Sequence, residues 1–179
     1  MTDGEVTLAV YSADDANAHF RGEDDEMRRR FPAPRIATLD TTRAAVAQWI
    51  ARHESGGPYA YAVKLQARTL VGGCELRIIT ERTAHISYWI FPQFRGKGYA
   101  TKAVGLLCRA ASLLGIRRLE AHIDRNNYAS LRVVERVGFV CSGLVKDNED
   151  ADGIVRERTR WEISFGEGQG VNSGPVQPR

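Results

Sequence analysis

The chain has 179 residues, of which 43% are hydrophobic and 26% charged, and its formal net charge is +3. This length and composition predict one globular domain and exclude a fibrous or wholly disordered chain. The basic excess is too small to indicate nucleic-acid binding, and no apolar run approaches the roughly 20 residues of a membrane-spanning helix.

The first third of the chain predicts one strand and two helical regions. Residues 5–11 form a short apolar run that is typical of a strand. Residues 13–31 combine an acidic block with poor apolar spacing, so we expect a short helix followed by a loop or a weak helix, until a Phe-Pro-Ala-Pro segment interrupts the chain. A further helix is predicted from about Thr42 to a Gly-Gly-Pro turn, with an apolar face of Ala45, Val46, Trp49 and Ile50.

The rest of the chain predicts further strands and helices. Three strands in succession are expected at residues 59–65, 69–79 and 84–91, and a strand at 117–123 follows the next helix. That helix begins near residue 99, stops at Gly115, and has an apolar stripe of Ala100, Ala103, Val104, Leu107, Ala111 and Leu114. Another helix begins at Asn126 or Asn127 and ends at Gly138, before two last strands at 139–145 and 155–165.

This order of elements predicts the fold class. Three consecutive strands with short turns should be antiparallel, whereas the strand–helix–strand crossover that follows requires a parallel pair. We therefore expect an α/β protein with a mixed, mostly antiparallel sheet and helices on its faces. Residues 1–165 form the single domain, and residues 166–179, which contain almost nothing apolar, are expected to be a disordered tail.

The N-terminus and the cysteines indicate the compartment. The first residues have neither the basic nor the apolar region of a secretory signal. Cys74, Cys108 and Cys141 are odd in number and too far apart in sequence for a metal knuckle, so no metal site is expected. They predict buried free thiols in a reducing cytoplasm.

The most informative stretch is Gln93-Phe94-Arg95-Gly96-Lys97-Gly98-Tyr99-Ala100, between a strand and the strongest helix. Its glycines allow a tight turn and the close approach of a ligand. Exposed N–H groups of the turn and of the first helical turn would then bind an anion, with a pyrophosphate as the expected occupant. Arg95 and Lys97 add positive charge.

Three known kinds of glycine-rich turn can be compared with this stretch. A dinucleotide fingerprint needs Gly or Ala where Thr101 stands, and it belongs after the first strand of a parallel fold. A Walker A loop needs four residues between its glycines and Ser or Thr after its lysine, and neither is present. The third is an ordinary glycine-rich turn that caps a helix.

The strands and helices around this stretch favour a further interpretation. The segments YWIFPQFRGKGYATKAV and DRNNYASLRVVERVGF, in this order of strands and helices, resemble the GNAT (Gcn5-related) family of N-acetyltransferases. The first segment is similar to the family's acetyl-CoA motif, Q/R-x-x-G-x-G/A. The two segments together look most like those of the branch that contains the ribosomal-protein alanine N-acetyltransferases. The resemblance covers about residues 5–165 and implies a GNAT fold, in which the parallel strand pair splays apart.

The resemblance implies a set of residues for acetyl-CoA, which is the expected co-substrate. The pyrophosphate would lie on the backbone amides of the loop and the helix start, which are those of Phe94, Arg95, Gly96, Lys97, Gly98, Tyr99, Ala100 and Thr101. The pantetheine arm would lie beside the strand Tyr88, Trp89, Ile90 and Phe91, with Asn127 as a hydrogen-bond partner. A strand amide near Trp89 or Ile90 would stabilise the oxyanion of the tetrahedral intermediate.

The acid and the base of a direct transfer to an amine are harder to assign. Many family members carry a tyrosine where this chain has Val134, and the resembling branch instead places a serine, here Ser130, near the sulfur. Ser130 could also be a simple helix-start residue, and Tyr128 is a weaker candidate.

The amine must lose a proton before it attacks, so a base is required. Glu75, in the middle of an apolar strand, could be that base or could pair with Arg77. His85, on the adjacent strand, is a second candidate, although relatives often have an acidic residue there. Lys102 stands where the branch often has Glu, so no role is carried over to that position.

The resemblance implies an acetyltransferase whose acceptor is a primary amine, either a protein N-terminus or a small molecule. The acidic block of residues 23–26 would cover the acceptor site, and it could steer a cationic amine or be a solvated loop that Arg28, Arg29 and Arg30 balance. A non-catalytic acyl-CoA-binding sensor is the alternative function. We expect no nucleic-acid or membrane partner, and relatives occur as monomers and homodimers.

Overall fold

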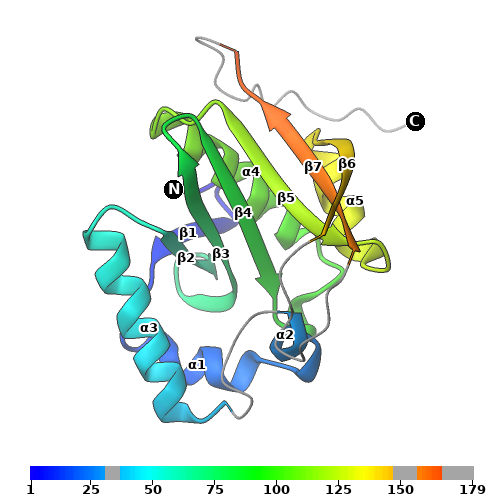
Figure 1. The fold of residues 1–179 in the computed structure, drawn as a ribbon. Coiled ribbons are helices and arrows are strands. Elements are labelled where there is room, and N and C mark those ends of the chain that lie inside the picture. The colour runs from blue at the N-terminus through cyan, green and yellow to red at the C-terminus, as the bar shows by residue number, and fades with distance from the viewer. Residues whose placement is uncertain (31–36, 147–156, 167–179) are drawn as a thin grey trace.

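A single mixed sheet of seven strands, in the order β1-β2-β3-β4-β5-β7-β6, organises the molecule (Figure 1). The computed structural model describes residues 1–30, 37–146 and 157–166. The strands are β1 (Val6–Val10), β2 (Tyr59–Leu65), β3 (Thr69–Thr80), β4 (Thr83–Ile90), β5 (Arg118–Asp124), β6 (Val140–Lys146) and β7 (Glu157–Ser164). The helices are α1 (Asp15–Gly22), α2 (Asp25–Arg30), α3 (Leu39–Glu54), α4 (Tyr99–Leu113) and α5 (Tyr128–Val137), with a short 3₁₀ turn, η1, at Pro92–Phe94.

The strand pairing confirms the predicted mixed sheet. Strands β1 to β4 are successively antiparallel, and so are the pairs β5–β7 and β6–β7. Strands β4 and β5 are parallel, but they pair only where Thr83–His85 lies opposite Arg118–Glu120. Beyond this short join the two strands separate, so the sheet is split at the carboxyl end of β4.

The two faces of the sheet carry separate apolar clusters. One face packs against α4 and α5, whose buried side chains include Leu106, Leu107 and Val134. The other face packs against α1, α2 and α3 through a smaller cluster that contains Met27 and Val46. Helices therefore cover both faces, as predicted, and the split in the sheet opens between these two layers.

Helix boundaries follow from capping. Helix α3 begins at Leu39, three residues before the predicted start at Thr42, because Thr38 and Thr41 form a capping box in which each side chain accepts from the other's backbone N–H. Helix α4 ends at Leu113, so Leu114, which we expected in its apolar stripe, is 45% exposed. Asn127 caps α5, and Gly138 ends it with a φ of +102°.

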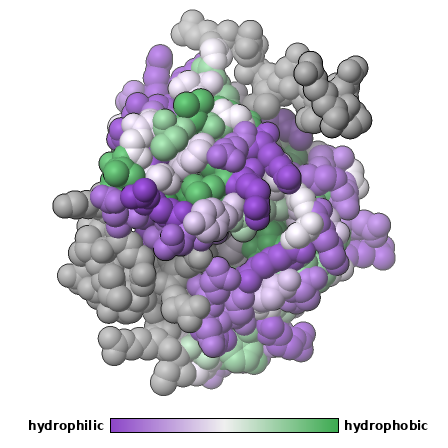
Figure 2. Space-filling view, turned by 90° about the vertical axis from the view of Figure 1, so that its right-hand side faces the viewer, coloured by the Kyte–Doolittle hydropathy of each residue, from purple (hydrophilic) through white to green (hydrophobic). Residues whose placement is uncertain are grey.

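The cysteine prediction is confirmed in part. Cys74 and Cys108 are buried free thiols, and burial raises the pKa of both, that of Cys108 to about 12. Cys141 is exposed, contrary to the prediction, because β6 is an edge strand that pairs only with β7. Val140 and Leu144 of the same edge strand are also exposed. Figure 2, which views the right-hand side of Figure 1, shows a surface on which hydrophilic residues surround small hydrophobic groups.

Three predictions fall beyond the described residues. These are the interruption at the Phe-Pro-Ala-Pro segment, the start of the last strand at Val155, and the tail of residues 166–179, of which the structure describes residue 166 alone. Within the described residues, no helix is long and apolar enough to cross a membrane.

Candidate functional site

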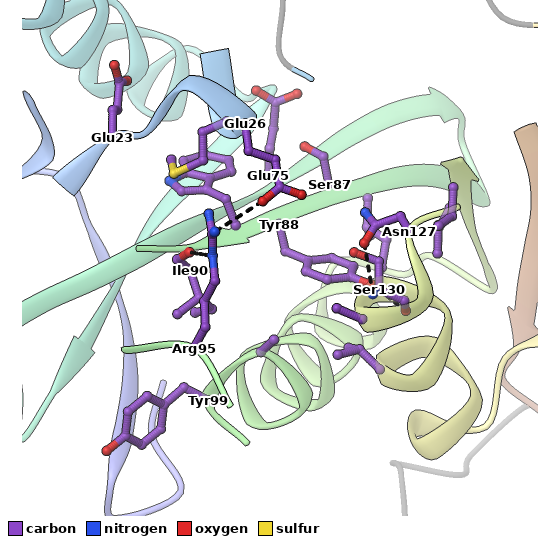
Figure 3. A pocket seen from close by; sticks show the side chains of 18 of the residues that line it. Glu23, Glu26, Glu75, Ser87, Tyr88, Ile90, Arg95, Tyr99, Asn127 and Ser130 are labelled. Atoms are coloured by element: carbon purple, nitrogen blue, oxygen red, sulfur yellow. Dashed lines mark hydrogen bonds and ion pairs between the residues drawn. The ribbon is translucent and has the colours of Figure 1, made fainter. Parts of the chain in front are cut away.

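A large cavity occupies the split in the sheet. Its volume is about 1230 Å³, and it extends from the start of α4 past the ends of β4 and β5 to the layer of α1, α2 and α3. Side chains from both layers therefore face one space, and Figure 3 shows part of its lining.

The backbone of β4 supplies hydrogen-bonding groups to the split. The N–H of Phe91 donates to the carbonyl of Val71 in β3 at 2.9 Å. Because backbone groups alternate in direction along an antiparallel strand, those of Tyr88 and Ile90 point the other way, toward β5. Pairing with β5 has ended at His85 by that point, so these groups line the slot. The amide of Trp89 points to β3.

The glycine loop forms the other end of the slot. Gly96 and Gly98 have φ values of +77° and +80°, which other residues rarely adopt, and Gly98 is the N-cap of α4. The first backbone bond within α4 is from the Lys102 N–H to the Gly98 carbonyl. The N–H groups of Tyr99, Ala100 and Thr101 precede it and face outward, as the sequence predicted for an anion site.

Two groups of the predicted loop have internal partners. The amides of Phe94 and Arg95 donate to the carbonyls of Phe91 and Pro92, at 2.9 and 3.2 Å. The Arg95 guanidinium lies against carboxylates of α2 (Figure 3), while the ammonium of Lys97 lies 5.9 Å from the centre of the Phe94 ring. The amides that remain for the predicted anion site are therefore those from Gly96 onward.

A tyrosine and an asparagine fix the first turn of α5 beside the slot. The side-chain carbonyl of Asn127 accepts from the Ser130 N–H at 3.2 Å (Figure 3), which leaves the side-chain NH₂ of Asn127 as a donor. The Tyr88 hydroxyl donates to the Ser130 carbonyl at 3.0 Å. Ser130 is thus held through its backbone, and its hydroxyl takes no part in these contacts. Val134 is fully buried, and Tyr128 is 65% exposed.

Glu75 and His85 face the cavity from the other side of the sheet. Glu75 lies opposite Ser87 and Arg77 lies opposite His85, so all four side chains share one face of β3 and β4. Burial raises the pKa of Glu75 above its usual value, and the charges of Arg77 and Arg52 oppose this shift. A carboxyl with a raised pKa beside a cavity is suited to accept a proton. Glu75, His85 and Ser130 therefore line one cavity, from opposite faces of the sheet.

Several ring side chains of the cavity lie together in a way that the sequence did not predict. His19, Trp49 and Trp89 come from α1, α3 and β4, and His19 lies 5.1 Å from Trp49 and 6.0 Å from Trp89 between ring centres. The ring centres of His122, in β5, and His85 are 4.7 Å apart. Trp89 lies in the segment that resembles the acetyl-CoA motif, but no local pattern connects it with Trp49 or His19, and only the pairing of distant elements brings them together.

The acidic block is balanced differently from the prediction. Arg28 lies 3.6 Å from Glu23 and 3.5 Å from Asp25, whereas Asp24 and Glu26 pair with Arg95 of the glycine loop. Glu23 also contacts Nε2 of His19 at 3.0 Å. Glu23 and Glu26 of the block therefore line the cavity, whereas Asp25 is exposed.

Comparison with known proteins gives this site a family. Residues 5–140 match the model of the acetyltransferase (GNAT) domain, which is more than half of the chain. The chain therefore belongs to the GNAT acetyltransferase family, and it is an acetyltransferase that uses acetyl-CoA as co-substrate.

Individual relatives agree with this assignment. The chain is 29% identical over 159 residues to the probable N-acetyltransferase YjcK of Bacillus subtilis, covering 86% of this chain and 84% of that protein. It is 28% identical over 85 residues to the uncharacterized N-acetyltransferase YycN of B. subtilis, covering 45% of this chain and only 54% of that protein. A solved structure of RimL, a ribosomal L7/L12 alpha-N-protein acetyltransferase in complex with coenzyme A, has a TM-score of 0.82 and 20% identity, covering 92% of this chain and 97% of that one. This last likeness concerns the fold.

Proposed function

We propose that the protein transfers the acetyl group of acetyl-CoA to a primary amine by direct attack of the amine nitrogen. One observation carries the proposal: the slot between β4 and β5 brings an anion-binding loop, unpaired strand backbone and the half-buried Glu75 to a single cavity. The loop and the strand are suited to bind a long phosphorylated thioester. The carboxyl of Glu75 is suited to accept a proton from the amine.

Backbone groups of this chain fit acetyl-CoA. The amides of Gly96, Lys97, Gly98, Tyr99, Ala100 and Thr101 would hold the pyrophosphate, with help from the positive end of the α4 dipole. The amides of Tyr88 and Ile90 and the carbonyl of Tyr88 would pair with the pantetheine arm, and the NH₂ of Asn127 would donate to it. The direction of the β4 amides favours Tyr88 or Ile90, and not Trp89, as the donor to the thioester oxygen.

The proton transfers can be assigned to side chains. Glu75 would accept the proton that the amine loses as its nitrogen bonds to the acetyl carbon, and His85 is the alternative base. The hydroxyl of Ser130 would donate a proton to the sulfur as the carbon–sulfur bond breaks. Tyr88 supports this role by holding the carbonyl of Ser130 at 3.0 Å. Proton exchange with water would then restore the hydroxyl of Ser130 and the carboxylate of Glu75, so the products are the amide and the free thiol of coenzyme A.

The acceptor would enter on the side of α1, α2 and α3. Trp49 and Trp89, whose ring centres are 6.0 Å apart, give this part of the cavity an aromatic wall, and Glu23 and Glu26 lie beside it. We favour a protein N-terminus, because the wall belongs to a cavity of about 1230 Å³ and because RimL, with the same fold, carries the name of an alpha-N-protein acetyltransferase. The buried free thiols Cys74 and Cys108 support a cytoplasmic location.

The test combines binding with transfer. Calorimetry with acetyl-CoA should give a single site, and an amine panel of N-terminal peptides, polyamines and aminoglycosides should then release free thiol only with its acceptor. Transfer to peptides supports the preferred acceptor, and transfer to a small amine keeps the transferase but replaces that acceptor. Binding without release from any amine would contradict the proposal and favour an acyl-CoA sensor.

A further inference from the structure

Arg95 belongs to the glycine loop by sequence, but its side chain points away from the anion site. Its Nη1 lies 2.8 Å from Oδ2 of Asp24. The same Nη1 lies 3.1 Å from Oε2 of Glu26, and the Nε donates to the carbonyl of Ile90 at 2.9 Å (Figure 3). One guanidinium therefore connects the loop, the strand beside the slot and the start of α2.

Asp24 makes this contact important for α2. Its Oδ1 accepts the Met27 N–H at 2.8 Å and so caps the helix, while its Oδ2 accepts Arg95. Burial opposes the shift, but the Met27 amide and Arg95 together hold the pKa of Asp24 below its usual value. The carboxylate that caps α2 is thus fixed to the glycine loop.

Helix α2 in turn forms part of the acceptor wall. It has only six residues, too few to be stable without outside contacts. Met27, 6% exposed, anchors it in the cluster under the aromatic wall, and Glu26, Met27 and Arg28 line the cavity. A change in the Arg95 contact would therefore move groups on the acceptor side.

We propose that Arg95 is a positioning residue for the acceptor site and not a ligand of the cofactor phosphates. Two carboxylates already neutralise its charge, whereas Lys97, two residues later, has no such partner among the described residues. The loop thus divides its two cations, with Lys97 serving acetyl-CoA and Arg95 serving α2. This inference rests on the acetyl transfer proposed above.

The experiment compares Arg95→Gln, Asp24→Asn and their double variant with Lys97→Gln. Asparagine at position 24 can still cap α2, so that variant removes the ion pair alone. We expect hydrogen exchange of the amides of residues 24–30 to rise about threefold to tenfold in either single variant, and no further in the double variant. The Kd of acetyl-CoA, measured by calorimetry, should stay within about twofold of the parent value. Lys97→Gln should instead raise the Kd of acetyl-CoA and leave the hydrogen exchange of residues 24–30 unchanged.

Kinetics with an amine from the panel provides a second readout. Arg95→Gln should raise KM for the amine and leave KM for acetyl-CoA unchanged, a split that general loss of stability would not produce. A higher Kd for acetyl-CoA in Arg95→Gln would overturn the proposal, whether or not exchange in α2 also changed. If the unaltered protein failed to bind acetyl-CoA, the proposed function would fail, while hydrogen exchange in α2 would still test the Arg95 contact.

Discussion

The two halves of the cavity use different parts of the chain. The half proposed for acetyl-CoA would use mainly backbone: the amides from Gly96 to Thr101 and those of Tyr88 and Ile90, which point into the slot. The acceptor half consists of side chains from α1, α2, α3, β3 and β4. A backbone site tolerates many sequences but few backbone conformations, so it leaves a short glycine motif. The side chains of a site can differ in every member of a fold, so such a site leaves no motif in the sequence.

The largest effect is expected where the backbone site is blocked. Gly98→Glu should raise the Kd of acetyl-CoA at least about 100-fold, because the carboxylate would face the phosphates and the side chain would disfavour the φ of +80°. Gly115→Glu is the matched control, since Gly115 has the same φ at the opposite end of α4. Calorimetry that found equal losses in both variants would show that strain, and not the anion site, is responsible.

A substitution in the side-chain half should instead affect chemistry. Glu75→Gln should lower kcat about 100-fold and leave the Kd of acetyl-CoA unchanged. Because burial raises its pKa, the parent enzyme should lose activity as the pH falls through a value above 4.5, and the variant should lack this limb. If His85→Gln removes the limb and Glu75→Gln does not, His85 is the base.

Ser130 lies where the two halves meet, so its effect should be smaller. Ser130→Ala should lower kcat about tenfold, with KM for acetyl-CoA nearly unchanged, because the contacts with Asn127 and Tyr88 use its backbone. Unchanged kcat would make Ser130 a helix-start residue only. Tyr88→Phe is the companion variant, since it removes the hydrogen bond to the Ser130 carbonyl and keeps the ring.

The smallest effect concerns stability. The folded-state pKa of Glu75 is raised, so its contribution to stability is fully present below the unfolded-state pKa and is lost as the pH rises through the folded-state pKa. Glu75→Gln should therefore raise the midpoint of thermal unfolding at neutral pH, with no gain at pH below 4. The exposed Glu54→Gln serves as control. A lower midpoint at neutral pH would show that ionised Glu75 is stabilising.

Sequence reasoning was strongest where local signals decide structure. Strand alternation, the helix caps at Asn127 and Gly138 and the glycine motif are local, and the fold and the family followed from them. It was weakest for contacts across the chain. Nothing adjacent to Arg95 indicates a partner at Asp24, and nothing near Trp89 indicates Trp49 or His19. The start of α3 was misplaced because Thr41 substitutes for the acidic residue of the usual capping box.

The short join between β4 and β5 also bears on how the molecule holds together. Among the described residues, the β4–β5 ladder has three residue pairs, and it is the one ladder that joins β1–β4 to β5–β7. A ligand that bonds to both edges of the slot would work as an extra strand and complete the sheet. We therefore expect the two parts to open independently in the free protein and as one cooperative unit with acetyl-CoA bound.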